Sequence, residues 1–237
     1  MQLTLITPYR NRLHHLINQL AWWEHYPFKR MLQWIVVEVT RSPSAALQQM
    51  LEKYQITYLH LFCEGTFHKT KALNLGLNCA KGEFVAAFDV DLIPLGRTLE
   101  RHCWLAERSP YCLLTGYRLM AATDTVNLTT LTQSLEQVTT APEDQPTALR
   151  KHLLKGERFG VMPLFRHDRL LAVNGWDEAF IGWGAEDQDL IERYLSTDQA
   201  LCRCPELTYL HLRHELAADW NSTKLTECNR AYYYNRR

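Results

Sequence analysis

Two aspartates stand one residue apart at the end of an apolar run, in the stretch FVAAFDVD at 84–91. The apolar residues are typical of a strand buried on both faces, and Asp89 and Asp91 would project to the same side if that strand continued through them. A buried carboxylate needs a cation or a hydrogen-bond donor, and hard divalent cations prefer oxygen ligands. The pair therefore indicates an ion that bridges the protein to a diphosphate. The alternative is two solvated aspartates in a turn before Pro94.

More acids follow a glycine-rich segment, GWGAEDQDL at 182–190. Its glycines let the backbone approach a ligand closely, and Trp183 offers a flat apolar face with one N–H donor, which suits stacking on a sugar ring. A carboxylate held beside that ring is a reasonable base for a sugar hydroxyl. The alternative is that the acids only open a helix and complement its dipole.

Two histidines, His211 and His214, stand three residues apart near the end of another apolar run. In a regular strand they would point to opposite faces, so they reach one ion only if the chain turns between them. The alternative is that both are structural. Glu215 beside them is a hydrogen-bonding partner for such a ligand or a solvated side chain.

Two smaller groups of cationic residues lie in the first third of the chain. PYRNR at 8–12 places Arg10 and Arg12 where the first predicted strand ends, and Phe67–Lys69 precedes a predicted helix. A helix N-terminus that follows such a segment suits a phosphate. The alternative for each is a solvated charge.

Alternating strands and helices must position these residues. Strands are predicted at 3–7, 34–39, 56–62 and 83–91, and helices at 11–26, 43–54 and 70–82. We expect Pro8 to end the first strand, Ser42 or Ser44 to cap the second helix, and Gly82 to stop the third.

The alternation implies parallel strands joined by helical crossovers, and in such sheets ligands bind beyond the carboxyl ends of the strands. We therefore expect Thr7–Arg12, Glu38 and Asp89–Asp91 to converge on one crevice.

The remainder of the chain has a less regular pattern. Helices are predicted at 97–108 and from Asp187 to Leu195, and apolar segments at 161–165 and 207–212 complete the domain. Residues 121–158 are rich in Thr, Gln, Pro and Glu, which indicates a surface excursion. The tail YYYNRR at 232–237 is expected to be a disordered, solvated end, with a weak membrane-surface contact as the alternative.

Composition limits the classes of protein. The chain has 237 residues, 46% hydrophobic, which suits one α/β domain, and 26 basic residues balance 26 acidic ones, so no global field favours nucleic acid. Seven scattered cysteines without a CxxC pair argue against a disulfide framework or zinc ribbon and favour a reducing cytosol. No signal peptide and no apolar run of about 20 residues is present. We expect a soluble, cytoplasmic protein, with the inner face of the membrane as an alternative location.

Taken together, the motifs resemble a known family. PYRNR (8–12), FDVDLIP (88–94), NGW (174–176), GWGAEDQDL (182–190) and HLRH (211–214) occur in the order seen in animal β-1,4-galactosyltransferases. FHKTKALNLGLNCAKGEF (67–84) is similar to bacterial family-two glycosyltransferases such as chondroitin polymerase modules. The resemblance spans residues 3–214 without 121–158. It implies a single GT-A-type α/β domain over 1–237, with a mostly parallel central sheet flanked by helices. Residues 1–95 would form the nucleotide-binding half, and 96–237 the acceptor-side half.

The resemblance also implies roles for individual residues. Asp91 and His214 fall on the metal ligands of the family, and His211 stands where the animal enzymes have a ligand methionine, so the metal preference is expected to differ. Asp187 would be the catalytic base, Trp183 and Glu186 would face the sugars, and Gln188 receives no role. Together with the crevice expected above, the residues assigned to the nucleotide sugar are Pro8, Arg10, Arg12, Glu38, Phe67, Lys69, Asp89 and Trp183.

The implied activity is a metal-dependent, inverting transfer from a UDP-sugar to a glycan acceptor hydroxyl. The sugar would be a hexose or N-acetylhexosamine, galactose-type favoured, and the ion Mn²⁺, with Mg²⁺ or another divalent ion as alternatives. Residues 176–184 are a candidate lid. A catalytically silent nucleotide-sugar or glycan-binding module is the first alternative. A nucleotidyltransferase is disfavoured, because PYRNR contains no glycine where those enzymes have a glycine-rich phosphate loop.

Overall fold

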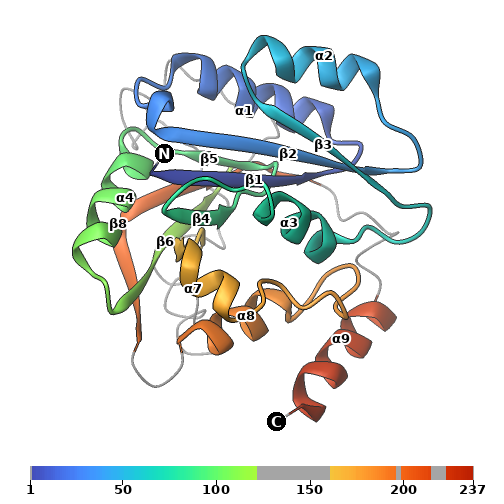
Figure 1. Cartoon of the computed structure of the whole chain (residues 1–237), viewed down its shortest axis with the longest axis vertical. Helices are drawn as coiled ribbons and strands as arrows, with labels where there is room; N and C mark the ends of the chain where they lie inside the picture. Colours follow the sequence, from blue (N-terminus) through green and yellow to red (C-terminus); the bar gives the residue numbers. More distant parts are fainter. Residues whose placement is uncertain (1, 122–160, 196–198, 215–222, 237) are drawn as a thin grey trace.

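The computed structural model describes residues 2–121, 161–195, 199–214 and 223–236 (Figure 1). The predicted excursion at 121–158 therefore lies, apart from Ala121, outside the described residues.

A five-stranded sheet forms the centre of the molecule, in the order β3-β2-β1-β4-β7. Its parallel strands are β1 (Leu3–Tyr9), β2 (Leu32–Thr40), β3 (Thr57–Phe62) and β4 (Phe84–Ala87). The short β7 (Phe165–Arg166) pairs antiparallel with β4. The mostly parallel central sheet predicted from the alternating pattern is confirmed.

Side chains of the central strands pack alternately into two cores, one on each face of the sheet. Trp34 of β2 packs with α1 (Leu13–His25) and α2 (Ala45–Lys53). Its neighbour Ile35 packs on the other face with α3 (Lys69–Leu77), α7 (His167–Ala172) and α8 (Glu186–Leu195). Figure 1 shows α1 and α2 over one face and α3, α7 and α8 over the other. Since successive residues of a strand point to opposite faces, the continuous apolar run of β2 fills both cores.

A second sheet of three strands, in the order β5-β8-β6, extends the domain. In it β8 (Ala200–His211) pairs antiparallel with β5 (Leu92–Pro94) and parallel with β6 (Cys112–Met120), and α4 (Thr98–Arg108) packs against β6 and β8. The register places His211 opposite Leu92, and the Leu212 N–H donates to the Asp91 carbonyl at 2.8 Å. The end of β8 is thereby held against the turn that follows β4.

Three predicted boundaries in the first half are wrong. Pro8 does not end β1, because β1 pairs with β2 through Tyr9. The Ile6 carbonyl accepts a hydrogen bond at 2.8 Å from the N–H of Phe88, which follows β4, and the backbone of Pro8 faces the same side, beyond the last residue of β1 that pairs with β4. The missing N–H of proline therefore interrupts no ladder.

Gly82 does not stop the third helix, which ends at Leu77. It approaches β1 instead: its N–H donates to Thr4 Oγ1 at 2.9 Å, and a Cβ at this position would lie 2.5 Å from the Thr4 nitrogen. The predicted N-cap of the second helix is confirmed, since Ser44 accepts a hydrogen bond from the Leu47 N–H.

The predicted fourth strand is also shorter than expected. It ends at Ala87, so Asp89–Asp91 form a turn rather than the end of a strand. The turn is closed by the Leu92 N–H, which donates to the Asp89 carbonyl at 3.0 Å. The two aspartates consequently meet different partners.

The C-terminal tail is not a disordered end. Its residues 232–235 belong to α9 (Thr223–Asn235), in which Tyr233 is buried and donates its hydroxyl to Glu192 of α8 at 2.8 Å. Tyrosines that pack one face and bond through their hydroxyls order this segment. Among the described residues, no helix is long and apolar enough to cross a membrane.

Candidate functional site

The site lies where the strand order of the main sheet reverses. Strands β2 and β3 lie on one side of β1, and the next strand of the chain, β4, lies on the other side. Ligands of open α/β sheets bind beyond the carboxyl ends of the strands at such a switch point. Arg10 and Arg12 follow β1 here, and Asp89 and Asp91 follow β4.

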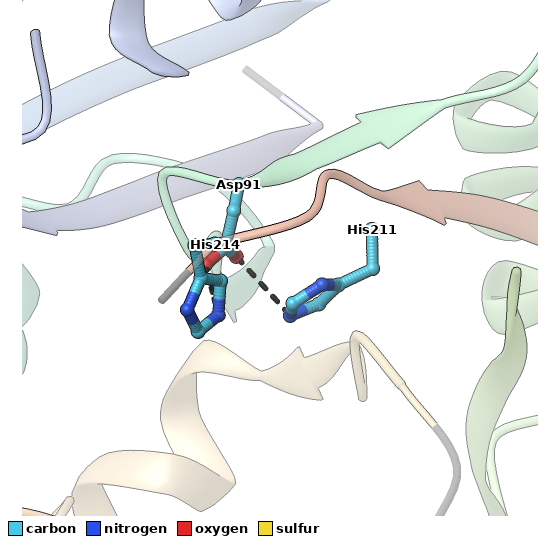
Figure 2. A group of neighbouring side chains, drawn as sticks. All are labelled: Asp91, His211 and His214. Atoms are coloured by element: carbon cyan, nitrogen blue, oxygen red, sulfur yellow. Dashed lines mark ion pairs between the residues drawn. The ribbon is translucent and has the colours of Figure 1, made fainter. Parts of the chain in front are cut away.

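Three predicted metal ligands meet at this point. One ligand atom each from Asp91, His211 and His214 lies within 4.8 Å of the others. Asp91 Oδ1 is 3.5 Å from His211 Nε2, and Asp91 Oδ2 is 3.2 Å from His214 Nε2 (Figure 2). Because β8 ends at His211, the chain turns before His214, and both imidazoles reach the same carboxylate.

Arg12 closes the group from the end of β1. Its Nη1 lies 3.1 Å from Asp91 Oδ2 and its Nη2 lies 3.2 Å from His214 Nδ1. Burial by itself would raise the pKa of Asp91, but His211, His214 and Arg12 outweigh it and lower this pKa, so the carboxylate is ionised.

The donors present fit a divalent ion. Among the described residues, Asp91 Oδ1 and His211 Nδ1 are buried without a hydrogen-bond partner, although Oδ1 lies 3.5 Å from His211 Nε2. Burial lowers the pKa of His211 in spite of the opposing Asp91 charge, which favours the neutral imidazole that binds metals. One carboxylate oxygen and two imidazole nitrogens form a mixed donor set that suits a first-row divalent ion such as Mn²⁺ better than Mg²⁺, which prefers oxygen ligands.

A second group of charges surrounds Lys69 at the start of α3. Its Nζ lies 3.4 Å from Asp89 Oδ1, 3.5 Å from Glu186 Oε1 and 3.4 Å from Asp187 Oδ2. Lys69 and Glu186 are buried, whereas the side chains of Asp89 and Asp187 are 46% and 54% exposed. The lysine thus joins the turn after β4 to the first residues of α8, and both outer carboxylates face solvent.

Burial and charge act in opposite directions in this group. Burial by itself would lower the pKa of Lys69, but Asp187, Asp89 and Glu186 raise it, so the ammonium is retained. Burial raises the pKa of Glu186, the Asp187 charge adds to this, and Lys69 opposes it.

The glycine-rich turn before α8 depends on its two glycines, because φ is 76° at Gly182 and 118° at Gly184. The Gly184 N–H donates to Glu186 Oε2 at 2.8 Å. From α9, Asn229 Nδ2 donates to the carbonyls of Ile181 and Trp183 at 2.9 and 3.1 Å. The turn is therefore held from both sides, and it leaves the Trp183 side chain 45% exposed, close in sequence to Asp187.

An open pocket of about 910 Å³ lies at the carboxyl ends of β1, β2 and β3. Arg10 lines it, donates to the carbonyls of Val39 and Gly65, and lies with its guanidinium carbon 5.4 Å from the centre of the Phe67 ring. Arg10 and Phe67, both assigned to the nucleotide from the sequence, are brought together here.

Two other assigned residues, Glu38 and Pro8, are buried in the strands beside this pocket. Glu38 is buried and accepts hydrogen bonds from the Ser44 N–H at 2.9 Å and the Tyr58 hydroxyl at 2.6 Å. Pro8 is buried within β1, opposite Val37. Their roles in nucleotide binding stay predictions.

Residues 176–184, the candidate lid, are hydrogen-bonded to α3 and its approach. Asn74 bonds to both the N–H and the carbonyl of Trp176, Thr70 donates to the Phe180 carbonyl, and the Gly182 N–H donates to the Phe67 carbonyl. Closure by this segment stays a prediction.

His15, Gln19 and Asn229 were not predicted from the sequence, although their side chains donate hydrogen bonds to backbone carbonyls of the site. One signal for the first two was available. They are polar residues among the apolar positions 13, 16, 17, 20 and 23 of the predicted first helix. Asn229 lies in a segment that was not predicted to be a helix.

Comparisons with known proteins agree with this architecture. Residues 149–215 match the family model described as the N-terminal domain of galactosyltransferase. No curated protein sequence matches the chain significantly.

Solved structures provide the wider match. The first 349 residues of S. aureus TarS superpose with a TM-score of 0.63 at 20% identity, covering 90% of this chain and 60% of that one. The same protein in complex with UDP-GlcNAc gives 0.63 at 18% identity, covering 94% and 61%. A mannosyltransferase from Pyrobaculum calidifontis in complex with GDP-Man and Mn²⁺ gives 0.60 at 16% identity, covering 90% and 57%. The chain thus spans about 60% of the length of these chains, and it has the GT-A-type fold that the sequence resemblance implied.

Proposed function

We propose that the protein is a metal-dependent, inverting glycosyltransferase that moves a hexose or N-acetylhexosamine, galactose-type favoured, from a UDP-sugar to a glycan acceptor hydroxyl. One observation carries this proposal. Lys69 forms ion pairs with both Asp89 and Asp187. Asp91, which follows Asp89 by two residues, belongs to the candidate metal cluster. An ion bound to Asp91 and a base at Asp187 would therefore act in the same part of the crevice, at the carboxyl ends of the strands.

The donor nucleotide would occupy the pocket beyond β1, β2 and β3. Arg10 offers a cation at its wall and lies over the ring of the buried Phe67. Arg12, which pairs with Asp91, lies where it can exchange that carboxylate for a phosphate oxygen. The likeness to TarS, whose complex contains UDP-GlcNAc, supports a UDP-sugar as donor.

The candidate ion site is Asp91, His211 and His214. A divalent ion bound there would supply positive charge against the departing diphosphate. Mn²⁺ is our first choice, with Mg²⁺ or another divalent ion as alternatives, and the Mn²⁺ in the structurally similar mannosyltransferase supports it.

Asp187 is the proposed base. Its side chain is 54% exposed and its Oδ2 is held by Lys69, so the carboxylate is fixed on one side and open to an acceptor on the other. It would take the proton of the acceptor hydroxyl as that oxygen attacks the anomeric carbon. The half-exposed Trp183 offers the sugar a stacking surface. The buried Glu186, which bonds to Gly184, would act mainly by shaping the turn that carries Trp183.

The test is release of UDP from UDP-Gal, UDP-GalNAc, UDP-Glc and UDP-GlcNAc by purified protein, with and without Mn²⁺ and with a panel of glycan acceptors. We expect turnover with one donor that requires the ion, and loss of it in Asp91→Asn. Asp187→Asn should lower transfer by about 100-fold or more, the usual contribution of a general base. Asp168→Asn, the same change at an exposed aspartate of α7, is the matched control.

Other outcomes would contradict specific parts of the proposal. Full activity without a divalent ion removes the metal assignment, and full transfer by Asp187→Asn removes the base. Donor binding without turnover across all acceptors would favour a catalytically silent binding module. We further propose a reducing compartment such as the cytoplasm, because all seven cysteines are free thiols.

A further inference from the structure

The two parts of the candidate metal cluster come from distant segments of the chain, and one helix contacts both. Asp91 belongs to the turn from Asp89 to Leu92, and Arg213 lies between the two histidines. On α1, Gln19 Nε2 donates to the carbonyls of Asp89 and Leu92 at 2.8 and 2.9 Å.

One helical turn earlier on α1, His15 reaches the other part of the cluster. Its Nε2 lies 3.1 Å from the Arg213 carbonyl, so this nitrogen carries the proton and donates. Residues four apart lie on the same face of a helix, so His15 and Gln19 present two donors side by side toward the cluster. Neither side chain contributes a ligand atom to the group of Asp91, His211 and His214.

Both side chains are placed there at an energetic cost. Gln19 is 0% and His15 is 1% exposed, on a helix face that otherwise packs leucine and tryptophan into the core. Each also has a second polar atom, Gln19 Oε1 and His15 Nδ1, that is buried without a hydrogen-bond partner among the described residues. Buried polar groups are unfavourable unless bonded, and apolar side chains of similar size would avoid this cost. What the polar side chains provide in return is hydrogen bonds to the backbone segments that carry the candidate metal ligands.

These bonds act on the spacing of the ligands. The Asp89 and Leu92 carbonyls flank Asp91, and Arg213 lies between the residues that carry the two imidazoles. The segments touch each other directly through the Leu212 N–H and the Asp91 carbonyl. With α1 as a common support, neither segment can shift relative to the other without breaking one of these bonds.

We infer that His15 and Gln19 are positioning residues for a divalent cation: from one face of α1 they hold the Asp91 turn and the His211–His214 segment at the separation that lets the three side chains bind one ion. This inference rests on the metal site of the proposed function and adds to it a pair of residues that touch neither ion nor substrate. Partners that orient metal ligands typically contribute a factor of 10 to 100 in metal affinity.

The experiment measures binding of Mn²⁺ alone to the full chain, without nucleotide, by electron paramagnetic resonance of the free ion. Gln19→Met and His15→Phe remove the donors at similar volume, and each is expected to weaken Mn²⁺ binding about 10- to 100-fold. His15→Gln, which keeps an N–H donor of similar reach, should stay within about threefold of wild type. Gln48→Met makes the same chemical change at an exposed glutamine of α2 and should leave the affinity unchanged.

The outcomes separate this inference from the proposed function. If wild type binds Mn²⁺ and folded Gln19→Met and His15→Phe bind it equally well, the positioning role is overturned and the metal site stands. If wild type binds no Mn²⁺ and Asp91→Asn behaves identically, the metal site falls and the inference with it. If Gln19→Met or His15→Phe does not fold, Gln19→Asn and His15→Gln provide the test. We expect weaker Mn²⁺ binding in Gln19→Asn, whose amide is one methylene too short to reach the carbonyls. His15→Gln should bind Mn²⁺ almost as well as wild type. Equal affinity in both overturns the role.

Discussion

Nζ of Lys69 lies 3.4 Å from Oδ2 of Asp187, which ties the first turn of α3 to the side chain proposed as the base. The same ammonium group lies 3.4 Å from Asp89 Oδ1 and 3.5 Å from the buried Glu186. From the sequence Lys69 was assigned to the nucleotide sugar. Its position supports a second role, in which one cation holds the donor side and the acceptor side of the crevice together.

Removing this cation should destabilise the fold through Glu186. Lys69→Met leaves the buried Glu186 without its charge partner, and breaking a buried pair in this way costs about 3 kcal/mol. We expect the double variant Lys69→Met with Glu186→Gln to recover much of the loss, because no unpaired charge stays buried. Urea denaturation of wild type, both single variants and the double variant measures this. Additive losses in the double variant would mean that the two residues do not interact.

The histidine at 211 should set the metal preference. Imidazole is a harder donor than the thioether that animal galactosyltransferases are expected to have at this position, so wild type should use Mg²⁺ better than His211→Met does. We predict that the ratio of Mg²⁺-supported to Mn²⁺-supported activity falls at least severalfold in His211→Met. Steady-state rates over a titration of each ion measure it. An unchanged ratio would show that His211 is not a ligand.

A buried histidine away from the site should make stability depend on pH. His102 Nδ1 lies 2.7 Å from the Tyr209 hydroxyl and its Nε2 lies 3.0 Å from the Leu114 carbonyl. Burial lowers the pKa of His102 to about 4, with the Leu114 bond opposing the shift. The unfolded chain therefore binds more protons between pH 6.5 and about 4, so the stabilisation is complete above pH 6.5 and is lost as the pH falls toward 4.

This contribution should amount to about 2 kcal/mol between pH 7 and pH 5. Urea denaturation at the two pH values measures it in wild type and in His102→Gln. The other histidines are common to both proteins, so the variant should be less stable at pH 7 and lose less stability on acidification. Parallel pH dependences would assign the effect to other groups.

The central fold was predictable because the apolar runs of β1 to β4 and the helices between them follow the periods of buried strands and amphipathic helices. The sequence offered a turn at the two aspartates only as the alternative to a strand that continues through them. The apolar run continues through Phe88, whereas β4 ends at Ala87, and in the turn that follows the carbonyls of Asp89 and Leu92 accept hydrogen bonds from Gln19 of α1. A contact across 70 residues overrides the local pattern.

The meeting of Asp91, His211 and His214 in a candidate metal cluster was predictable from the motifs and their resemblance, but the residues that support the cluster were not. Asp91, His211 and His214 carry chemistry that can be recognised in a motif. His15, Gln19 and Asn229 act through bonds to backbone carbonyls, and a carbonyl leaves no trace in the sequence. The tail was assigned to disorder because its packing depends on partners in the turn before α8 and in α8 itself.

Asn229 should control acceptor binding from the far end of the chain. It is buried in α9 and donates to the Ile181 and Trp183 carbonyls, which fixes the turn that presents Trp183. Asn229→Leu removes both bonds at similar volume and leaves two carbonyls unpaired. If water replaces one of the two lost bonds, the net loss of stabilising free energy in the turn is about 1.4 kcal/mol. If that energy is needed to order the turn around the acceptor, KM for the acceptor rises about tenfold. Donor hydrolysis without acceptor should stay within about twofold, because both bonds of Asn229 go to the turn that carries Trp183 rather than to the candidate metal cluster. Tyr234→Leu on the exposed face of α9 is the control. Equal losses in hydrolysis and transfer would instead assign Asn229 to general stability.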